Sequence, residues 1–493
     1  MKKRSAYLAI DFGTSNVHAS VIDAETTRII VNTNKKYGWY YPAQNQVELH
    51  IDETWKASEW AVGEVIRQLP EDVELLAITF SYFGDSITPV DEKGEALYGM
   101  IPGFCGRSFK EVQTIGREIG ADTYAKITGN TLSTLATPSK IMWLRDNEPE
   151  VFKKAAGFYS NQQYVMRKLG LGDVQDRTMA ARKLMIDVKA NCWSAPILEL
   201  AGVTEQQLGT QIVESATVVG TIDHYGSVRL PRTLPVTIGC HDVSASLLSA
   251  GVQLENPDTI GVLMGTYEQM GYFSDTFVDG CNDFGDSLIF SCCYSSPFNN
   301  KYTVMDAFPT AGALLEWFCK NILRDPSADI GKLIADAKLD GTGSLMMLPY
   351  VENFHGAVVG MSLSTTTDEI FAAILESLAY QFVACVDYIR STREQPFTRL
   401  HFGGGGSRTD KLLQLRADLI QAPLGRMQNI ELPSLGACML AGLGNNWYAS
   451  VEDAAAHMGN PVSYFEPIPE NETKYAERYA KYKAISADYL RRY

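Results

Sequence analysis

The sequence predicts an α/β protein made of two large domains. Two segments, each a strand, a Gly-Thr turn and a returning strand, begin about 250 residues apart, and this self-similarity indicates a duplicated fold. After each of them strands alternate with helices, the pattern of α/β domains. At roughly 150 residues per domain, a chain of 493 residues allows two or three. We therefore expect domains over residues 1–245 and 246–493, with a cleft between them.

Both hairpins are defined by short apolar runs on either side of a polar, glycine-containing tip. In the first, residues 6–10 form a buried strand, 11–16 the turn and 17–23 the returning strand. In the second, residues 259–264 and 269–273 are the strands around Gly265 and Thr266.

Further elements follow from hydrophobic spacing. Residues 75–80 are expected to form a strand and 146–169 to be largely helical. Apolar residues at intervals of three and four predict an amphipathic helix over 368–389, with two acidic residues in its first turn. Residues 399–402 then form a strand, and a helix is expected over 410–421.

Composition excludes several classes of protein. Subtracting 43 basic from 58 acidic residues leaves a net charge of −15, which argues against nucleic acid or an anionic membrane as partner. The apolar run after the basic N-terminus ends at Asp11, too short for a signal peptide or a membrane span. Nine cysteines without metal or disulfide spacing fit a reducing compartment, so we expect a cytoplasmic protein.

Three glycine turns each follow a strand: one at Gly13, one at Gly265 and one over residues 403–406. Glycine lets backbone N–H groups approach an anion, so the three together predict a phosphate cradle. The last turn lacks the G-x-G-x-x-G order, and no G-x-x-x-x-G-K-[ST] occurs. Taken singly, a four-glycine turn is also explained as a tight strand-to-helix connection.

A His-Asp pair, His241 and Asp242, interrupts an apolar run just before a helix that begins near Ser244. A carboxylate at such a strand end can accept a proton from a substrate hydroxyl. Asp242 is explained equally well as a cap of the following helix.

These motifs resemble the FGGY carbohydrate kinases in order and spacing. The resemblance is carried by residues 11–15, 239–242, 265–266 and 404–408, and by a C-terminal signature over 356–361 and 369–376. Weaker matches extend it from about residue 6 to residue 455.

The resemblance implies two actin-like, ribonuclease-H-like domains that bind ATP, Mg²⁺ and a sugar, with a possible homodimer. Asp242 would be the catalytic base, and Asp11 and Asp242 would help to place the metal. The remaining residues would contact ATP or its phosphates: Gly13, Thr14, Ser15, Gly265, Thr266, Gly312, Gly404, Gly405, Gly406 and Ser407.

The acceptor segments differ from those of xylulose-type members, whose Gln-Met-His run and Trp-containing loop are absent. The stretch 79–94 looks more like that of the 6-deoxyketose kinases for fuculose and rhamnulose. Phe83 or Phe104 would pack on the sugar, while Asp85 and Arg107 would hold hydroxyls; Gly84 and His241 complete the predicted acceptor site. Phe83 as a core residue and His241 as a structural one remain open.

The alternatives are a xylulose-, ribulose- or glycerol-type kinase, a non-catalytic actin-like ATP-binding protein, and a degenerate kinase homologue with a regulatory role. Asp242 together with a sugar-loop segment at 79–108 favours a kinase, because a pure ATPase needs neither.

Overall fold

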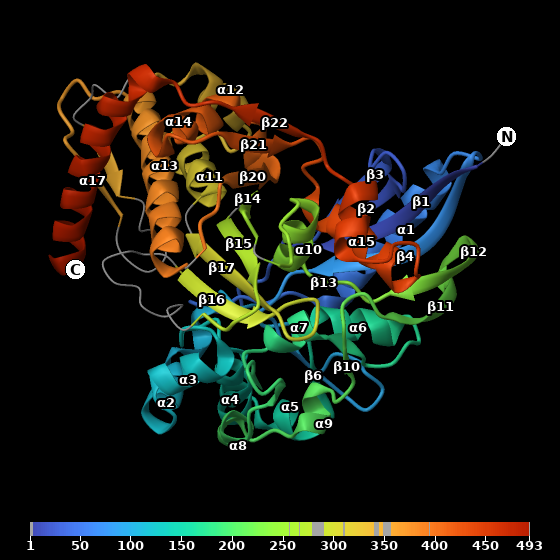
Figure 1. Cartoon of the computed structure of the whole chain (residues 1–493). Helices are drawn as coiled ribbons and strands as arrows, with labels where there is room; N and C mark the ends of the chain where they lie inside the picture. The colour runs from blue at the N-terminus through green and yellow to red at the C-terminus, as the bar shows by residue number, and fades with distance from the viewer. Residues whose placement is uncertain are drawn as a thin grey trace.

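The computed structural model describes residues 3–255, 257–265, 267–278, 290–308, 311–339, 345–348, 356–393 and 395–492. Two mixed seven-stranded sheets flanked by helices dominate the fold (Figure 1). The predicted two-domain α/β class is therefore confirmed, and the boundary at residue 245 stays a prediction.

The first sheet has the strand order β11-β12-β4-β1-β2-β3, with β13 paired to β4. The predicted N-terminal hairpin is its β1–β2 pair, and α1 (Ile51–Gln68) packs against β2 and β3. The strands are β1 (Arg4–Phe12), β2 (Asn16–Asp23), β3 (Ile29–Lys36), β4 (Val73–Tyr82), β11 (Val218–Tyr225), β12 (Val228–Thr237) and β13 (Cys240–His241).

The second sheet has the order β16-β17-β15-β14-β20-β21-β22 and contains the second predicted hairpin as β14–β15. Its strands are β14 (Thr259–Met264), β15 (Glu268–Ser274), β16 (Phe290–Ser295), β17 (Tyr302–Phe308), β20 (Arg399–Gly403), β21 (Leu424–Met427) and β22 (Val462–Phe465). The accompanying elements are α11 (Gly312–Asn321), α12 (Ile330–Asp336), β18 (Met346–Leu348), β19 (Ala357–Val359), α13 (Thr367–Thr392), α14 (Asp410–Ile420), α16 (Val451–His457) and α17 (Glu472–Arg492).

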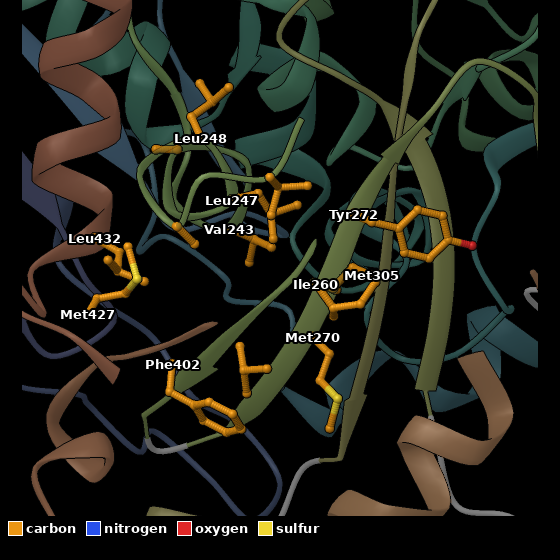
Figure 2. Packing of buried hydrophobic residues seen from close by; sticks show 14 of the residues in the cluster. Val243, Leu247, Leu248, Ile260, Met270, Tyr272, Met305, Phe402, Met427 and Leu432 are labelled. Carbon is orange, nitrogen blue, oxygen red and sulfur yellow. The ribbon is translucent and has the colours of Figure 1, made fainter. Parts of the chain in front are cut away.

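Two helices, α10 (Asp242–Ser249) and α15 (Leu432–Gly444), lie between the sheets (Figure 1). They cross so closely that a Cβ on Gly436 would lie 1.8 Å from the Ala245 carbonyl oxygen. Figure 2 shows Val243 and Leu247 of α10 beside Ile260 of the second sheet, within one buried cluster. The beginning of α10, where Asp242 lies, is thus held by a packed core.

A mostly helical lobe with its own core inserts between β4 and β11. Here the prediction of helix over 146–169 is wrong in its middle: Pro149 starts a new helix after α4, and β6 pairs with β5 instead of continuing it. The lobe contains α2 (Phe109–Glu118), α3 (Ala121–Thr128), α4 (Thr137–Asn147), α5 (Pro149–Lys154), α6 (Asn161–Lys168), α7 (Arg177–Ala181), α8 (Ala195–Ala201) and α9 (Glu205–Leu208), with short strands β5 (Thr88–Val90), β6 (Gly157–Tyr159), β7 (Gln175–Asp176), β8 (Ile186–Asp187), β9 (Cys192–Trp193) and β10 (Ile212–Val213).

Helix α13 is long and apolar enough to span a membrane, but 78% of its most apolar window is buried inside the fold. It is therefore a core helix by its packing. The C-terminal α17 contacts it through a Tyr380–Tyr482 ring pair at 5.1 Å and an Arg478–Glu376 ion pair at 2.6 Å.

Candidate active site

Strand register brings the two predicted carboxylates to one edge of the first sheet. β1 and β13 both pair parallel to β4, so that Asp11 and Cys240 each lie opposite Ser81, and His241 lies opposite Tyr82. β13 can approach β4 because Gly239 precedes it at φ 74°, where a Cβ would lie 1.8 Å from the Phe80 carbonyl oxygen. Asp11 therefore lies near the end of β1 on one side of β4, and Asp242 directly follows β13 on the other side.

Asp11 accepts a short hydrogen bond from the Ser81 hydroxyl. Burial raises the pKa of Asp11, and the hydrogen bond from Ser81 and nearby His18 act in the opposite direction. Glu431, at the start of α15, adds to the upward shift of this pKa by repulsion. A residue of the second half of the chain therefore already acts on the Asp11 carboxylate.

The turn that follows Asp11 is held by hydrogen bonds to its backbone and exposes two hydroxyl residues to solvent. The Gly13 amide donates to the Asn16 carbonyl at 2.9 Å, and the Tyr37 hydroxyl donates to the carbonyls of both residues. Thr14 and Ser15 are exposed. Their exposure is compatible with the predicted phosphate contact, which stays a prediction.

Asp242 is the first residue of α10, and its carboxylate accepts from the Val243 amide at 2.7 Å and lies 3.2 Å from His241 Nε2. Burial, and then the charge of Asp11, raise the pKa of Asp242 to about 7, against the Val243 hydrogen bond and nearby Arg182. The residue at the N-cap position is His241, so Asp242 does not cap the helix in the usual way.

Gly84 and Asp85 lie beside this pair. A Cβ on Gly84 would lie 3.0 Å from His241 Nε2 and 3.1 Å from the Arg182 side chain. Asp85, at φ 56°, forms an ion pair with Arg182 at 2.5 Å, while its buried Oδ1 has no hydrogen-bond partner among the described residues. Asp85 and Arg182 also act on the pKa of Asp242, in opposite directions.

Arg182 was missed by the sequence analysis. It is buried and also donates to Asn130 Oδ1 at 2.9 Å. No motif marks it, because the sequence around it is an ordinary helical run that ends in Arg-Lys.

Of three further predicted acceptor residues, two are buried away from solvent and one, Phe104, is exposed. Phe83 is buried in the core of the first sheet, so the core interpretation holds. Arg107 has a fully buried side chain, which forms an ion pair with Glu48 at 2.8 Å and donates to the Tyr98 hydroxyl and the Val47 carbonyl, so its donors are used within the protein. Phe104 is 41% exposed and meets Trp39 edge-on, next to Gly103, whose Cβ position lies 2.8 Å from Asp85 Cβ.

The predicted nucleotide residues of the second half of the chain lie at the carboxyl ends of the neighbouring strands β14 and β20 of the second sheet. Leu263 pairs with Gly403, and the Gly312 amide donates to the Gly265 carbonyl at 3.2 Å. Gly404, at φ 82°, lies so close to β14 that a Cβ would be 2.7 Å from the Met264 carbonyl oxygen. Its amide donates to the carbonyl of Ile430, the neighbour of Glu431. The glycine turn is therefore bonded to the segment that carries Glu431, the residue that acts on Asp11.

Within that turn the residues differ in whether they are exposed to a bound ligand. Gly405 is exposed and has open space at its Cβ position. Ser407 is buried and its hydroxyl donates to the Gly404 carbonyl at 2.7 Å, so its side chain holds the turn together instead of facing a ligand. Gly406 packs against Met264. Thr266 lies outside the described residues.

The donor set around Asp11 and Asp242 fits a hard cation. Repulsion by Asp11 helps to raise the pKa of Asp242, and a divalent cation bound between the two carboxylates would offset this repulsion. Mg²⁺ keeps several waters and needs only one or two protein carboxylates. Among the described residues no group of three or more His, Cys, Asp and Glu forms a self-sufficient metal cage.

Comparison with known proteins identifies one family. Residues 6–249 match the N-terminal domain of the FGGY family of carbohydrate kinases, and residues 286–444 match its C-terminal domain. Curated relatives include a glycerol kinase of Desulforamulus reducens (25% identity; 92% of each chain), a xylulose kinase of Lactococcus lactis (24%; 97% of this chain and 96% of the relative) and an L-fuculokinase of Escherichia coli O157:H7 (24%; 95% and 99%).

Solved structures share the fold over nearly the whole chain. The gluconate kinase from Lactobacillus acidophilus aligns with a TM-score of 0.84 at 18% identity, covering 99% of both chains. The xylulose kinase from the same organism aligns with a TM-score of 0.83 at 18% identity, covering 98% of this chain and 97% of its own.

Proposed function

The chain belongs to the FGGY family of carbohydrate kinases and is therefore an ATP-dependent phosphotransferase with an alcohol acceptor. We propose that the acceptor is a ketose or related polyol, with a 6-deoxyketose such as fuculose or rhamnulose favoured. We also propose that Asp242 is the general base. The observation that carries the proposal is the juxtaposition of Asp242, Asp11 and the Asp85–Arg182 pair at one sheet edge.

Asp242 suits the role of base. In the reaction the acceptor oxygen bonds to the γ-phosphorus, the bond from that phosphorus to the β-phosphate oxygen breaks, and the hydroxyl proton passes to the Asp242 carboxylate. A pKa of about 7 leaves this carboxylate substantially ionised at neutral pH and still basic enough to take the proton. The Val243 amide donates to one of its oxygens at 2.7 Å, and His241 Nε2 lies 3.2 Å from the carboxylate.

Nucleotide binding is assigned to the two hairpins and the glycine turn. The exposed Thr14 and Ser15 and the backbone at Gly405 offer donors that a net charge of −15 does not cancel, since they act at contact distance; Gly265 and Gly312 shape the second hairpin, because their amides already donate to the carbonyls of Tyr267 and Gly265. Asp11 and Asp242 would hold Mg²⁺, which supplies charge neutralisation for the phosphates.

The preference for a deoxysugar is supported by what borders Asp85. The Asp85–Arg182 pair supplies an acceptor and a donor for sugar hydroxyls, with Asp85 Oδ1 still unpaired among the described residues. Phe104 presents an exposed apolar ring next to Gly103, which abuts Asp85. A 6-deoxyketose carries a methyl group beside several hydroxyls, and the exposed Phe104 ring beside the charged Asp85–Arg182 pair would suit both.

A coupled ADP-release assay over L-fuculose, L-rhamnulose, D-xylulose, D-ribulose, glycerol and gluconate tests the proposal. We expect the two 6-deoxyketoses to give the highest kcat/KM. A higher value for xylulose, ribulose or glycerol would favour the alternative within the family, which relatives named for xylulose and glycerol also support.

The base assignment has its own test. Asp242→Asn is expected to lower kcat by about 10² to 10⁴ on the best acceptor, the usual worth of a general base. Asp223→Asn, at an exposed position of β11, is the matched control and is expected to leave kcat unchanged. Activity of Asp242→Asn within a few-fold of the unmodified enzyme would remove Asp242 from the mechanism.

A further inference from the structure

One tyrosine holds the backbone of the turn after Asp11 through three of its carbonyl groups. The Tyr37 hydroxyl donates to the carbonyls of Gly13 and Asn16, and its oxygen lies 3.0 Å from that of Asn16. The Tyr37 amide donates to the Ser15 carbonyl at 3.1 Å. A carbonyl oxygen can only accept, so the single hydroxyl hydrogen is shared between two oxygens in a three-centre bond.

Tyr37 is itself fixed by its place in the fold. It directly follows β3, which pairs along its length with β2, the returning strand of the hairpin. Its ring packs against the hydrophobic core of the first sheet. The hydroxyl therefore reaches the turn from a side chain that is anchored at both its backbone and its ring.

Peptide geometry decides what this contact does to the turn. In a trans peptide the C=O and the N–H point in opposite directions, and none of the described peptide bonds is cis. Because the Gly13 carbonyl points at Tyr37, the Thr14 N–H of the same peptide points away from it. That amide donates to no carbonyl of the described residues, and Thr14 is exposed.

The face of the turn opposite Tyr37 therefore suits a polyanion. Backbone N–H groups that point outward from a turn bind phosphate oxygens, whereas carbonyl oxygens would repel them. Tyr37 turns three carbonyls to its own side and leaves the Thr14 N–H on the other. The turn also follows Asp11, which is proposed to help place the Mg²⁺ that bridges the β- and γ-phosphates of ATP.

We propose that Tyr37 is a positioning residue for nucleotide binding: by holding the carbonyls of Gly13 and Asn16, it keeps the Thr14 N–H directed at the β- and γ-phosphates of ATP. The inference rests on the proposed assignment of this hairpin to nucleotide binding. It gives a part in the reaction to a residue that lies outside the glycine-containing motif and that no sequence pattern marks.

Tyr37→Phe removes only the hydroxyl and keeps the ring in the core. In calorimetry with ATP and Mg²⁺, we expect the Kd for ATP to rise about 5-fold, the scale of one hydrogen bond. In the ADP-release assay with the best acceptor of the panel, the KM for ATP is expected to rise by a similar factor, while the KM for the acceptor changes by less than about 2-fold.

Tyr225→Phe is the matched control. It removes a hydroxyl that donates to Ser58 Oγ at 2.9 Å within the same hydrophobic core, and both KM values are expected to stay unchanged. An unchanged Kd for ATP in Tyr37→Phe, or an equal rise in both of its KM values, would overturn the proposal. The second result would mean that the hydroxyl supports the fold as a whole and not the phosphate contact.

Hydrogen–deuterium exchange examines the turn itself and needs no acceptor. In the ligand-free full chain, peptides covering residues 11–17 are expected to exchange faster in Tyr37→Phe than in the unmodified protein, and peptides of the second sheet to exchange equally in both. ATP with Mg²⁺ is expected to protect residues 11–17 less in the variant. Equal exchange of these residues in the two ligand-free proteins would contradict the proposed hold on the turn.

The same measurement separates this inference from the function on which it rests. If the unmodified protein binds ATP but ATP does not protect residues 11–17, the assignment of this hairpin to nucleotide binding fails. If ATP protects residues 11–17 equally in both proteins and with the same Kd, only the role of Tyr37 fails.

Discussion

Replacing Asp306 with Asn is expected to stabilise the protein at alkaline pH, and to do so by about half as much at about pH 5.5. Asp306 is a fully buried carboxyl on β17, opposite Ser291 of β16. Its Oδ1 has no hydrogen-bond partner among the described residues. Burial raises the pKa of Asp306 to about 7, and the hydrogen bond from Ser291 offsets this only in part.

The size of the effect follows from linkage. The pKa of Asp306 rises from 3.8 in the unfolded chain to about 7 in the folded protein, and each unit corresponds to about 1.4 kcal/mol. A raised carboxyl pKa gives a stability contribution that is fully present below the unfolded pKa and is lost as the pH rises through the folded one. The total is at most about 4 kcal/mol, of which about 2 kcal/mol is lost between about pH 5.5 and pH 7.

Asparagine imitates the protonated carboxyl and does not titrate, so the variant lacks this pH dependence. Urea unfolding of both proteins, followed by tryptophan fluorescence at about pH 5.5 and pH 8.5, measures the difference in the free energy of unfolding. Other buried carboxyls, such as that of Asp242, titrate equally in both proteins and cancel. Asp336→Asn, at an exposed position of α12, is the control. If Asp306→Asn were no more stable than the unmodified protein at the higher pH, the reasoning would be refuted.

Three further changes test other parts of the structure. Arg416→Met is expected to destabilise the protein by about 3–5 kcal/mol in urea unfolding, because it leaves Glu268 buried without its partner at 2.6 Å; a loss under about 1 kcal/mol would contradict this. Gly239→Ala is expected to abolish activity and lower the melting temperature, since its Cβ overlaps the Phe80 carbonyl; normal kcat would disprove the close approach of β13. Gly405→Val is expected to fold normally but to bind ATP about 10-fold more weakly in calorimetry, and an unchanged Kd would exclude this turn from nucleotide binding.

Local signals predicted the elements that carry the site. Both hairpins, the strand before the glycine turn and helix α13 were found, because alternation, glycine and three-to-four spacing are properties of neighbouring residues. The segment 146–169 failed for the opposite reason: β6 forms by pairing with β5, about 70 residues earlier in the chain, and no local pattern shows such a partner.

Site residues divide along the same line. Asp11 lies at the end of a strand, Asp85 follows one and Asp242 opens a helix, positions that sequence reasoning can recognise. Arg107 and Arg182 look alike in the sequence, yet Arg107 is neutralised by Glu48 away from Asp242, whereas Arg182 joins Asp85 beside it. Only the tertiary partner decides which arginine serves the site.

The candidate site shares the negative character of the whole chain, whose net charge is −15. The carboxylates of Asp11 and Asp85 both raise the pKa of Asp242, and Arg182 is the one cation among the groups that shift it. Because Arg182 is already paired with Asp85, the excess negative charge falls on Asp11 and Asp242, whose pKa values are both raised. A polyanionic nucleotide would increase that excess, so its binding requires either proton uptake or a cation that enters with it. Proton uptake would consume the proposed base, and a divalent cation is therefore the choice consistent with the proposal.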